Sequence, residues 1–283
     1  MAERGDPSAL RWLIGVELHN YRKRAGHTLA AAARALGCSA GLVSHFEKGL
    51  YFPQPEQIAG LLSFYGAPTW DVERLSSLSG RAEQRTWLAP WNDIIPDWLK
   101  TFVGLEGLAS HEVIYAPLVL PALVQTEGYS IGATAGSARV RPDQVERAVS
   151  LRMERQRRLF NDTPPLRLTA IIEESVLDRP IGNVDTMRRQ LRHLVELVER
   201  DTVEILVLPT AVGRHDSLEG MFTVLQFAQA QSIGYIEYPD GAIYVQDQDQ
   251  VAAYTRTAES LRSAALSQRE SVDAINARLA SLT

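Results

Sequence analysis

The sequence predicts two parts of different fold class: a helical N-terminal domain containing a helix-turn-helix, and a larger α+β domain with a central mixed sheet. Apolar residues recur at the 3.6-residue period of packed helices through the first 65 residues. Beyond residue 110, short apolar runs bounded by Pro, Gly and Asp alternate with helical patterns. A chain of 283 residues also suits one small domain followed by a larger one. We place these domains at residues 8–80 and 85–283.

Five helices are expected in the first domain, because residues that end helices follow each apolar pattern. These helices cover residues 10–25, 28–36, 39–48, 55–66 and 68–80. Thr28 and Ser39 can accept hydrogen bonds from the first free amides of the second and third helices. Glycines stand at the C-terminal ends of the first four helices, at positions 26, 37, 49 and 66.

The second and third helices, in the segment TLAAAARALGCSAGLVSHFEKG, have the pattern of a helix-turn-helix. Two helices that cross steeply need a tiny residue at the crossing, which is Ala33, and a turn residue that tolerates positive φ, which is Gly37. With Val43 and Phe46 in the core, the third helix presents small and polar residues on its opposite face. These residues are Ser39, Ala40, Gly41, Ser44, His45 and Lys48. This face suits the major groove of DNA, and the alternative is an ordinary helical hairpin with a polar outer face.

Residues 8–66 resemble the Xre/Cro-repressor type of helix-turn-helix domain, and the segment LGCSAGLVSHFEKG carries the resemblance. The resemblance implies that Glu47 pairs with Arg22 or Arg24 and thereby fixes the packing of the recognition helix. The chain departs from the family at one position. The family usually places Gln after the Thr that opens the second helix, and Leu29 stands there in this chain.

The same resemblance implies that Ser39, Ser44 and His45 face operator DNA. The full set of expected DNA-binding residues is Arg24, Thr28, Ser39, Ala40, Gly41, Ser44, His45 and Lys48. Because Ala40 and Gly41 carry no hydrogen-bonding side chain, direct readout is expected from Ser44, His45 and Lys48, with DNA shape supplying the rest. One such head should bind weakly. We therefore expect a homodimer whose two heads meet successive major grooves, about 34 Å apart, of a near-palindromic operator.

Charge is divided unevenly along the chain, whose net charge is −5. Residues 8–65 carry six basic and three acidic groups, a net charge of +3, and residues 81–283 carry 21 basic and 27 acidic groups, a net charge of −6. A mildly basic head on an acidic body suits a protein that presents one end to a polyanion.

The single cysteine, Cys38, excludes an intrachain disulfide and occupies an apolar turn position, where we interpret it as structural and not as a redox sensor. The N-terminus lacks the apolar segment of a signal peptide, and no apolar run approaches the roughly 20 residues of a membrane-spanning helix. The sequence therefore predicts a cytoplasmic protein without membrane contact.

The second domain is expected to contain six strands and four helices. The strands begin at residues 113, 167, 202, 221, 233 and 242, and the helices cover residues 142–160, 184–200, 247–266 and 269–281. The helix over 142–160 carries five arginines, at positions 147, 152, 155, 157 and 158. We interpret these arginines as a solvated face paired with neighbouring glutamates, in preference to an extension of the DNA-binding surface.

Segments of the second domain resemble, in order, the antitoxin-like C-terminal domain found behind Xre-type heads in actinobacterial regulators. The matching segments are PALVQTEGY (121–129), EESVLDRPIG (173–182), QLRHLVEL (190–197), VLPTAVGRHDSLEGMFTVLQF (207–227), YIEYPDGAIYVQD (235–247) and YTRTAESLRSAALSQRES (254–271). The resemblance implies developmental or stress-linked regulation, often with a small partner protein encoded nearby. Two functions stay open. The chain is a transcription regulator whose second domain mediates dimerisation and effector or partner response, or an antitoxin-like module that sequesters a small partner protein and autoregulates its operon.

Four residues of the second domain are candidates for contact with a small-molecule effector or a partner protein. They are Trp91, Trp98, Arg214 and His215. The tryptophans belong to an aromatic stretch that suits a core seam, a dimer interface or the wall of an apolar ligand site. Arg214 and His215 lie in the Gly-bounded loop GRHDSLEG, which is either a recognition loop or a solvated connection.

The sequence offers little support for an enzyme. Glu173 beside Glu174, and His215 beside Asp216, come nearest to an acid–base site, but adjacent residues rarely point at one another and no Ser or Cys elbow accompanies them. There is no P-loop, Rossmann glycine run, HExxH or paired CxxC motif, and the six histidines show no metal-ligand spacing. We therefore expect no metal, no cofactor and no catalysis.

Overall fold

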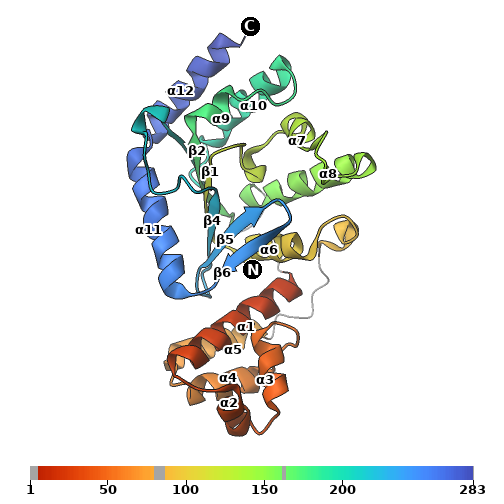
Figure 1. The fold of residues 1–283 in the computed structure, drawn as a ribbon, viewed down its shortest axis with the longest axis vertical. Coiled ribbons are helices and arrows are strands. Elements are labelled where there is room, and N and C mark those ends of the chain that lie inside the picture. Colours follow the sequence, from red (N-terminus) through yellow and green to blue (C-terminus); the bar gives the residue numbers. More distant parts are fainter. Residues whose placement is uncertain (1–5, 80–86, 161–163, 283) are drawn as a thin grey trace.

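The computed structural model describes residues 6–79, 87–160 and 164–282, which form a small helical head and a larger α+β body (Figure 1). The fold class predicted from the sequence is confirmed, because a helical N-terminal part precedes a part in which helices surround a mixed sheet. The domain boundary that we place between residues 80 and 85 lies outside the described residues.

Within residues 6–79, five helices form the head. They are α1 (Pro7–Arg24), α2 (Leu29–Leu36), α3 (Ala40–Glu47), α4 (Pro55–Phe64) and α5 (Thr69–Ser79). Their apolar faces meet in one core, in which Ile14, Leu18, Val43 and Ile58 are fully buried. The apolar residues that recur with the 3.6-residue period in the sequence are therefore the residues that these helices pack into this core.

The described part of the body contains six strands and seven α-helices. The strands are β1 (His111–Ala116), β2 (Arg167–Glu173), β3 (Val203–Leu208), β4 (Phe222–Gln226), β5 (Ile233–Tyr238) and β6 (Gly241–Val245). The helices are α6 (Asp97–Leu108), α7 (Glu127–Thr134), α8 (Val145–Gln156), α9 (Glu174–Asp178), α10 (Val184–Leu197), α11 (Gln248–Ala264) and α12 (Gln268–Ser281). The sequence analysis did not anticipate α6, α7 and α9.

The six strands form one sheet in the order β3-β2-β1-β4-β5-β6. β3, β2 and β1 run parallel to one another, whereas β4 is antiparallel to β1, β5 to β4, and β6 to β5. β1 is the junction between the two halves, since its Ile114 pairs with Ala170 of β2 and with Thr223 of β4. The carboxyl ends of the three parallel strands consequently lie at one edge of the sheet.

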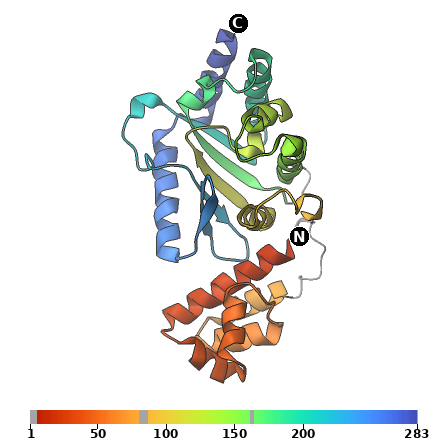
Figure 2. The same cartoon turned by 45° about the vertical axis from the view of Figure 1, so that its right-hand side comes forward.

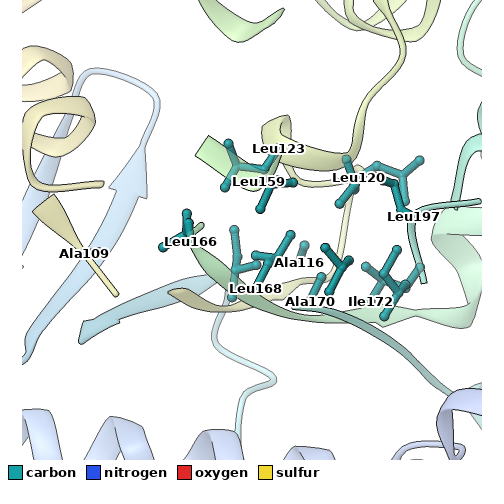
Figure 3. Close-up of a cluster of buried hydrophobic side chains, with 14 of the residues drawn as sticks. Ala109, Ala116, Leu120, Leu123, Leu159, Leu166, Leu168, Ala170, Ile172 and Leu197 are labelled. Carbon is teal, nitrogen blue, oxygen red and sulfur yellow. The ribbon is translucent and has the colours of Figure 1, made fainter. Parts of the chain in front are cut away.

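Helices cover both faces of the sheet (Figures 1 and 2). α11 lies on one face, where Tyr115 and Phe222 pack with Leu261. α6, α8 and α10 lie on the other face, over the largest core of the molecule. Figure 3 shows the β2 side chains of this core pointing toward residues of the segments that cover the sheet, with Leu168, Ala170 and Ile172 below Leu120, Leu123 and Leu159. Burial on both faces explains the continuous apolar sequence of β2.

Helix α1 packs on the head and on the body at once. Ile14 and Leu18 lie in the head core, whereas Ala9 and Val16 lie in the body core. α6 of the body approaches α1 closely because residue 104 is glycine. A β-carbon on Gly104 would lie 2.7 Å from the β-carbon of Ala9, which is shorter than van der Waals contact.

Polar contacts also join the head to the body. The carboxylate of Glu17, which is fully buried, accepts a hydrogen bond from the backbone amide of Gln231 at 2.6 Å. Asn20 donates to the carbonyl of Gln246 at 3.0 Å. Burial raises the pKa of Glu17, although Arg74 acts to lower it. The pKa of this carboxyl therefore depends on the contact between the head and the body.

The expectation that the arginines of residues 142–160 form a solvated face holds for Arg157, which is exposed and pairs with Glu154 at 3.1 Å. It is wrong for Arg155 and Arg158. Arg155 is buried and donates two hydrogen bonds to Glu106 of α6, at 3.0 and 2.6 Å. Arg158 is buried as well and donates to the carbonyl of Ala109 at 2.6 Å. α8 lies over α6, so a charge on α8 that faces inward requires a buried partner of opposite charge.

Candidate DNA-binding surface

Helices α2 and α3 meet in the geometry of a helix-turn-helix. The chain bends by 107° between them. Ala33 is 4% exposed, and Gly37 adopts a φ of +69°, which the turn requires. The hydroxyls of Thr28 and Ser39 each accept a hydrogen bond, at 3.1 Å, from the amide three residues later. Cys38 is half-buried at the turn, and burial raises the pKa of its thiol.

A buried ion pair fixes α3 to α1. Arg22 donates to Glu47 through Nε at 2.6 Å and through Nη2 at 2.7 Å, and it also donates to the carbonyl of His27 at 2.9 Å. His19 Nδ1 lies 3.0 Å from the same carboxylate. Burial acts to raise the pKa of Glu47, but hydrogen bonds from Arg22 and His19 outweigh it, and the pKa lies below its usual value. Of the two partners that the resemblance allows for Glu47, Arg22 forms the pair and Arg24 is exposed.

The outer side of α3 carries small and polar side chains. Val43 and Phe46 are 0% and 2% exposed and face the core. Ser44 and His45 are half-buried on the other side, and the ring of His45 meets the exposed Tyr51 edge-on, with centroids 4.9 Å apart. The remaining expected DNA-binding residues are exposed: Arg24, Thr28, Ser39, Ala40, Gly41 and Lys48.

A groove of about 420 Å³ runs along one side of this surface. Ser44 of α3 and Lys48, the residue that follows α3, line it together with Leu29, the residue that replaces the usual Gln. Trp12 of α1 and Gln246, which follows β6 of the body, also line it. The body therefore reaches the margin of the surface that α3 presents.

Comparison with known families agrees with both parts of the fold. A helix-turn-helix domain family matches residues 13–75, from α1 to α5. A family described as a domain of unknown function (DUF5753) matches residues 99–277, which is more than half of the chain. The chain belongs to the DUF5753 family. The helix-turn-helix match makes this DUF5753 protein a DNA-binding regulator. Neither the curated proteins nor the solved structures give a match.

Within the described residues of this DUF5753 protein, no single helix is long and apolar enough to cross a membrane, and α2 with α3 passes that test of length and composition only as a bent pair. In the same residues, no group of three or more His, Cys, Asp or Glu side chains is arranged to hold a metal ion.

The two candidate tryptophans, just ahead of the DUF5753 match, lie in different surroundings. Trp91 is half-buried against the large core, where Nε1 donates to Ser150 at 3.0 Å and the ring meets Trp87 edge-on. Trp98, on α6, lines a cavity enclosed between the sheet, α6 and α8. Of the three roles predicted for the aromatic stretch, Trp91 belongs to a core seam and Trp98 forms part of a cavity wall.

Arg214 and His215 point in different directions from the loop between β3 and β4 of the DUF5753 domain. Arg214 is exposed. His215 accepts from the amide of Ser217 through Nδ1 at 3.3 Å, and its Nε2 lies 3.2 Å from Glu173, to which Tyr115 also donates at 2.8 Å. Because Nδ1 accepts a hydrogen bond from the amide of Ser217, the proton of the neutral imidazole lies on Nε2, which faces Glu173. Both ring nitrogens are engaged, so this network holds the loop at the carboxyl ends of β1 and β2.

Glu112 of the DUF5753 domain, which is not among the residues predicted from the sequence, lines the same cavity as Trp98 and is 2% exposed. Its position could have been found. Side chains of a strand alternate between faces, and Glu112 shares its face with the buried Ile114 and Ala116. A carboxylate at an inward position of an apolar strand is costly to bury, which is typical of a functional site.

Proposed function

We propose that this DNA-binding regulator is of the Xre type and binds double-stranded operator DNA as a homodimer, with α3 of each head in a major groove. One observation carries the proposal: the buried pair of Arg22 and Glu47 holds α3 so that its small and polar side is exposed. Small residues at the start of α3 let the helix enter the groove closely, and the polar residues that follow can reach base edges.

Each residue of this surface has a proposed role. Thr28 and Ser39 stand at the first turns of α2 and α3, where free amides and the helix dipole favour phosphate. Arg24 is exposed and supplies charge to the DNA backbone. Ser44, His45 and Lys48 read bases, while Ala40 and Gly41 allow close approach.

The direct experiment is retardation of a DNA fragment from upstream of the protein's own coding region, followed by footprinting. The expected footprint covers two half-sites whose centres are about 34 Å apart. Absence of retardation for any native promoter fragment, even at about 50 mM salt, would overturn the proposal.

The variants His45→Ala and Arg24→Ala should have different effects, because one removes a base contact and the other a phosphate contact. His45→Ala is expected to relax sequence preference by about 1–3 kcal/mol at the contacted position. Arg24→Ala is expected to weaken binding to all sequences and to reduce the slope of log affinity against log salt by about one. Fluorescence anisotropy on operator variants at several salt concentrations measures both effects. Equal affinities of wild type and His45→Ala across the operator variants would refute the role of His45.

We further propose that residues 8–80 form the DNA-binding domain, and that residues 85–283 mediate dimerisation and respond to an effector or partner. An antitoxin-like role is the second candidate, and a surface of the body favours it. Leu118 and Leu218 are 63% and 61% exposed, and the loops that carry them meet at one pocket, which Pro117 and Leu218 line. Two exposed leucines on neighbouring loops suit a small protein partner.

Light scattering on the purified chain tests the dimer. Titration with the purified product of the neighbouring reading frame tests the partner. A Leu218→Ser variant that binds this product as well as wild type would argue against the proposed contact.

A further inference from the structure

A cavity with a volume of about 630 Å³ lies between the sheet, α6 and α8. Its walls are mainly apolar and include three aromatic side chains: Trp98, Phe102 and Tyr235. The rings of Phe102 and Tyr235 stack with centroids 4.1 Å apart, which gives the cavity a rigid flat wall. Volume and lining match those of sites for small molecules.

Two buried polar atoms at this cavity have no hydrogen-bond partner in the part of the chain that the structure describes. They are Oε2 of Glu112 and Oγ1 of Thr134, and both residues are 2% exposed. A buried polar atom without a partner lowers the stability of the fold, so native proteins seldom keep one without a reason. Two such atoms at one cavity indicate that a bound molecule supplies the missing partners.

One cation at the cavity also forms no close ion pair. Arg152 of α8 lines the cavity and donates to the side-chain oxygen of Gln125 at 3.1 Å, and within the described residues only the exposed carboxylate of Glu237, beyond ion-pair distance, acts on its charge favourably. Its neighbour Arg155 is neutralised by the buried Glu106. Gln125 is itself fixed, because it accepts from Ser130 at 2.8 Å. The guanidinium of Arg152 is therefore held in place and available to an anionic group.

We propose that this cavity binds a small, largely apolar molecule that carries one anionic group, with Arg152 pairing with the anion and Glu112 hydrogen-bonding a polar group of the apolar part. The molecule lies against Trp98, Phe102 and Tyr235. This ligand is the effector of the proposed regulator, but its binding to the cavity does not depend on DNA binding.

A row of aromatic contacts connects this cavity to the head. Tyr235 meets Tyr244 with ring centroids 5.3 Å apart, and Tyr244 meets Trp12 of α1 at 5.1 Å. Trp12 also lines the groove beside α3. A ligand that lies against Tyr235 is therefore connected, through Tyr244 and Trp12, to the helix that carries the head.

The test uses two fluorescent probes with the same aromatic skeleton. Anilinonaphthalene sulfonate carries an anion, whereas phenylnaphthylamine does not. On the full-length chain, Arg152→Met is expected to weaken binding of the sulfonate at least about ten-fold, because it removes a charge-assisted hydrogen bond, and to leave the uncharged probe within about two-fold. Arg152→Lys retains the charge and should recover most of the sulfonate affinity. Arg147→Met, on the same helix but in an exposed pair with Asp93, should change neither affinity.

Several results would overturn the proposal: more than one sulfonate site per chain, equal weakening of both probes by Arg152→Met, or equal weakening by Arg147→Met. Thermal melts of each variant separate loss of fold from loss of the site. DNA retardation is measured in parallel. If wild type binds the sulfonate in the cavity but does not bind DNA, the proposed regulator is refuted and the ligand site stands. If wild type binds DNA but not the sulfonate, only the ligand site is refuted.

Discussion

Replacing Glu47 with leucine is expected to lower the free energy of unfolding by about 3–5 kcal/mol and to abolish retardation of operator DNA. The substitution leaves the guanidinium of Arg22 buried, at 8% exposure, without the carboxylate that neutralises it. An uncompensated buried charge is among the largest penalties that a single substitution can introduce. Urea unfolding followed by circular dichroism measures the loss of stability, and a gel shift measures the loss of binding.

A double variant separates the charge from the packing. In Arg22→Met with Glu47→Leu, both charges are replaced by apolar side chains of similar size, so most of the lost stability should return. Arg24→Ala is the matched control, since Arg24 is exposed on the same helix and should leave stability within about 0.5 kcal/mol of wild type. A double variant as unstable as Glu47→Leu would show that the ion pair is not the source of the effect.

The head could be predicted in detail because its determinants are local. Gly37 and Ala33 lie four residues apart, and the caps Thr28 and Ser39 each act on an amide three residues away. Such short-range patterns can be recognised without knowing which distant segments meet. Which arginine pairs with Glu47 needed the structure, because Arg22 and Arg24 differ only in the side of α1 that they occupy.

The body was predictable as a set of strands but not as a site. Apolar runs indicated the six strands. Their order in the sheet depends on contacts between distant segments; β1, for example, lies between β2 and β4. The pairing of Glu173 with His215 joins residues 42 positions apart, so neighbours in sequence gave no sign of it. The burial of Arg155 was not predicted for the same reason. Its partner Glu106 lies on α6, a helix that the sequence pattern in and after the aromatic stretch did not indicate.

The second large effect is expected on the free energy of unfolding, and it arises from protonation of Glu112. Wild type is expected to lose stability relative to Glu112→Gln as the pH rises from about 5 to about 9. Burial, with the nearby Glu106 adding to it and Arg155 opposing it, raises the pKa of Glu112 from 4.5 to about 8. Between these values the folded chain holds a proton that the unfolded chain has released. The unfolded state is therefore favoured progressively as pH rises through this window.

Glutamine has nearly the same shape as glutamic acid but does not titrate, so the difference in stability between Glu112→Gln and wild type isolates this one group. The difference should grow with pH to on the order of 5 kcal/mol and level off at about pH 9. Urea unfolding at intervals of about one pH unit measures it. A constant difference for Glu112→Gln, or one that shrinks as pH rises, would mean that Glu112 is already ionised in the folded chain. The buried carboxyl would then repel the anionic group that Arg152 is proposed to bind.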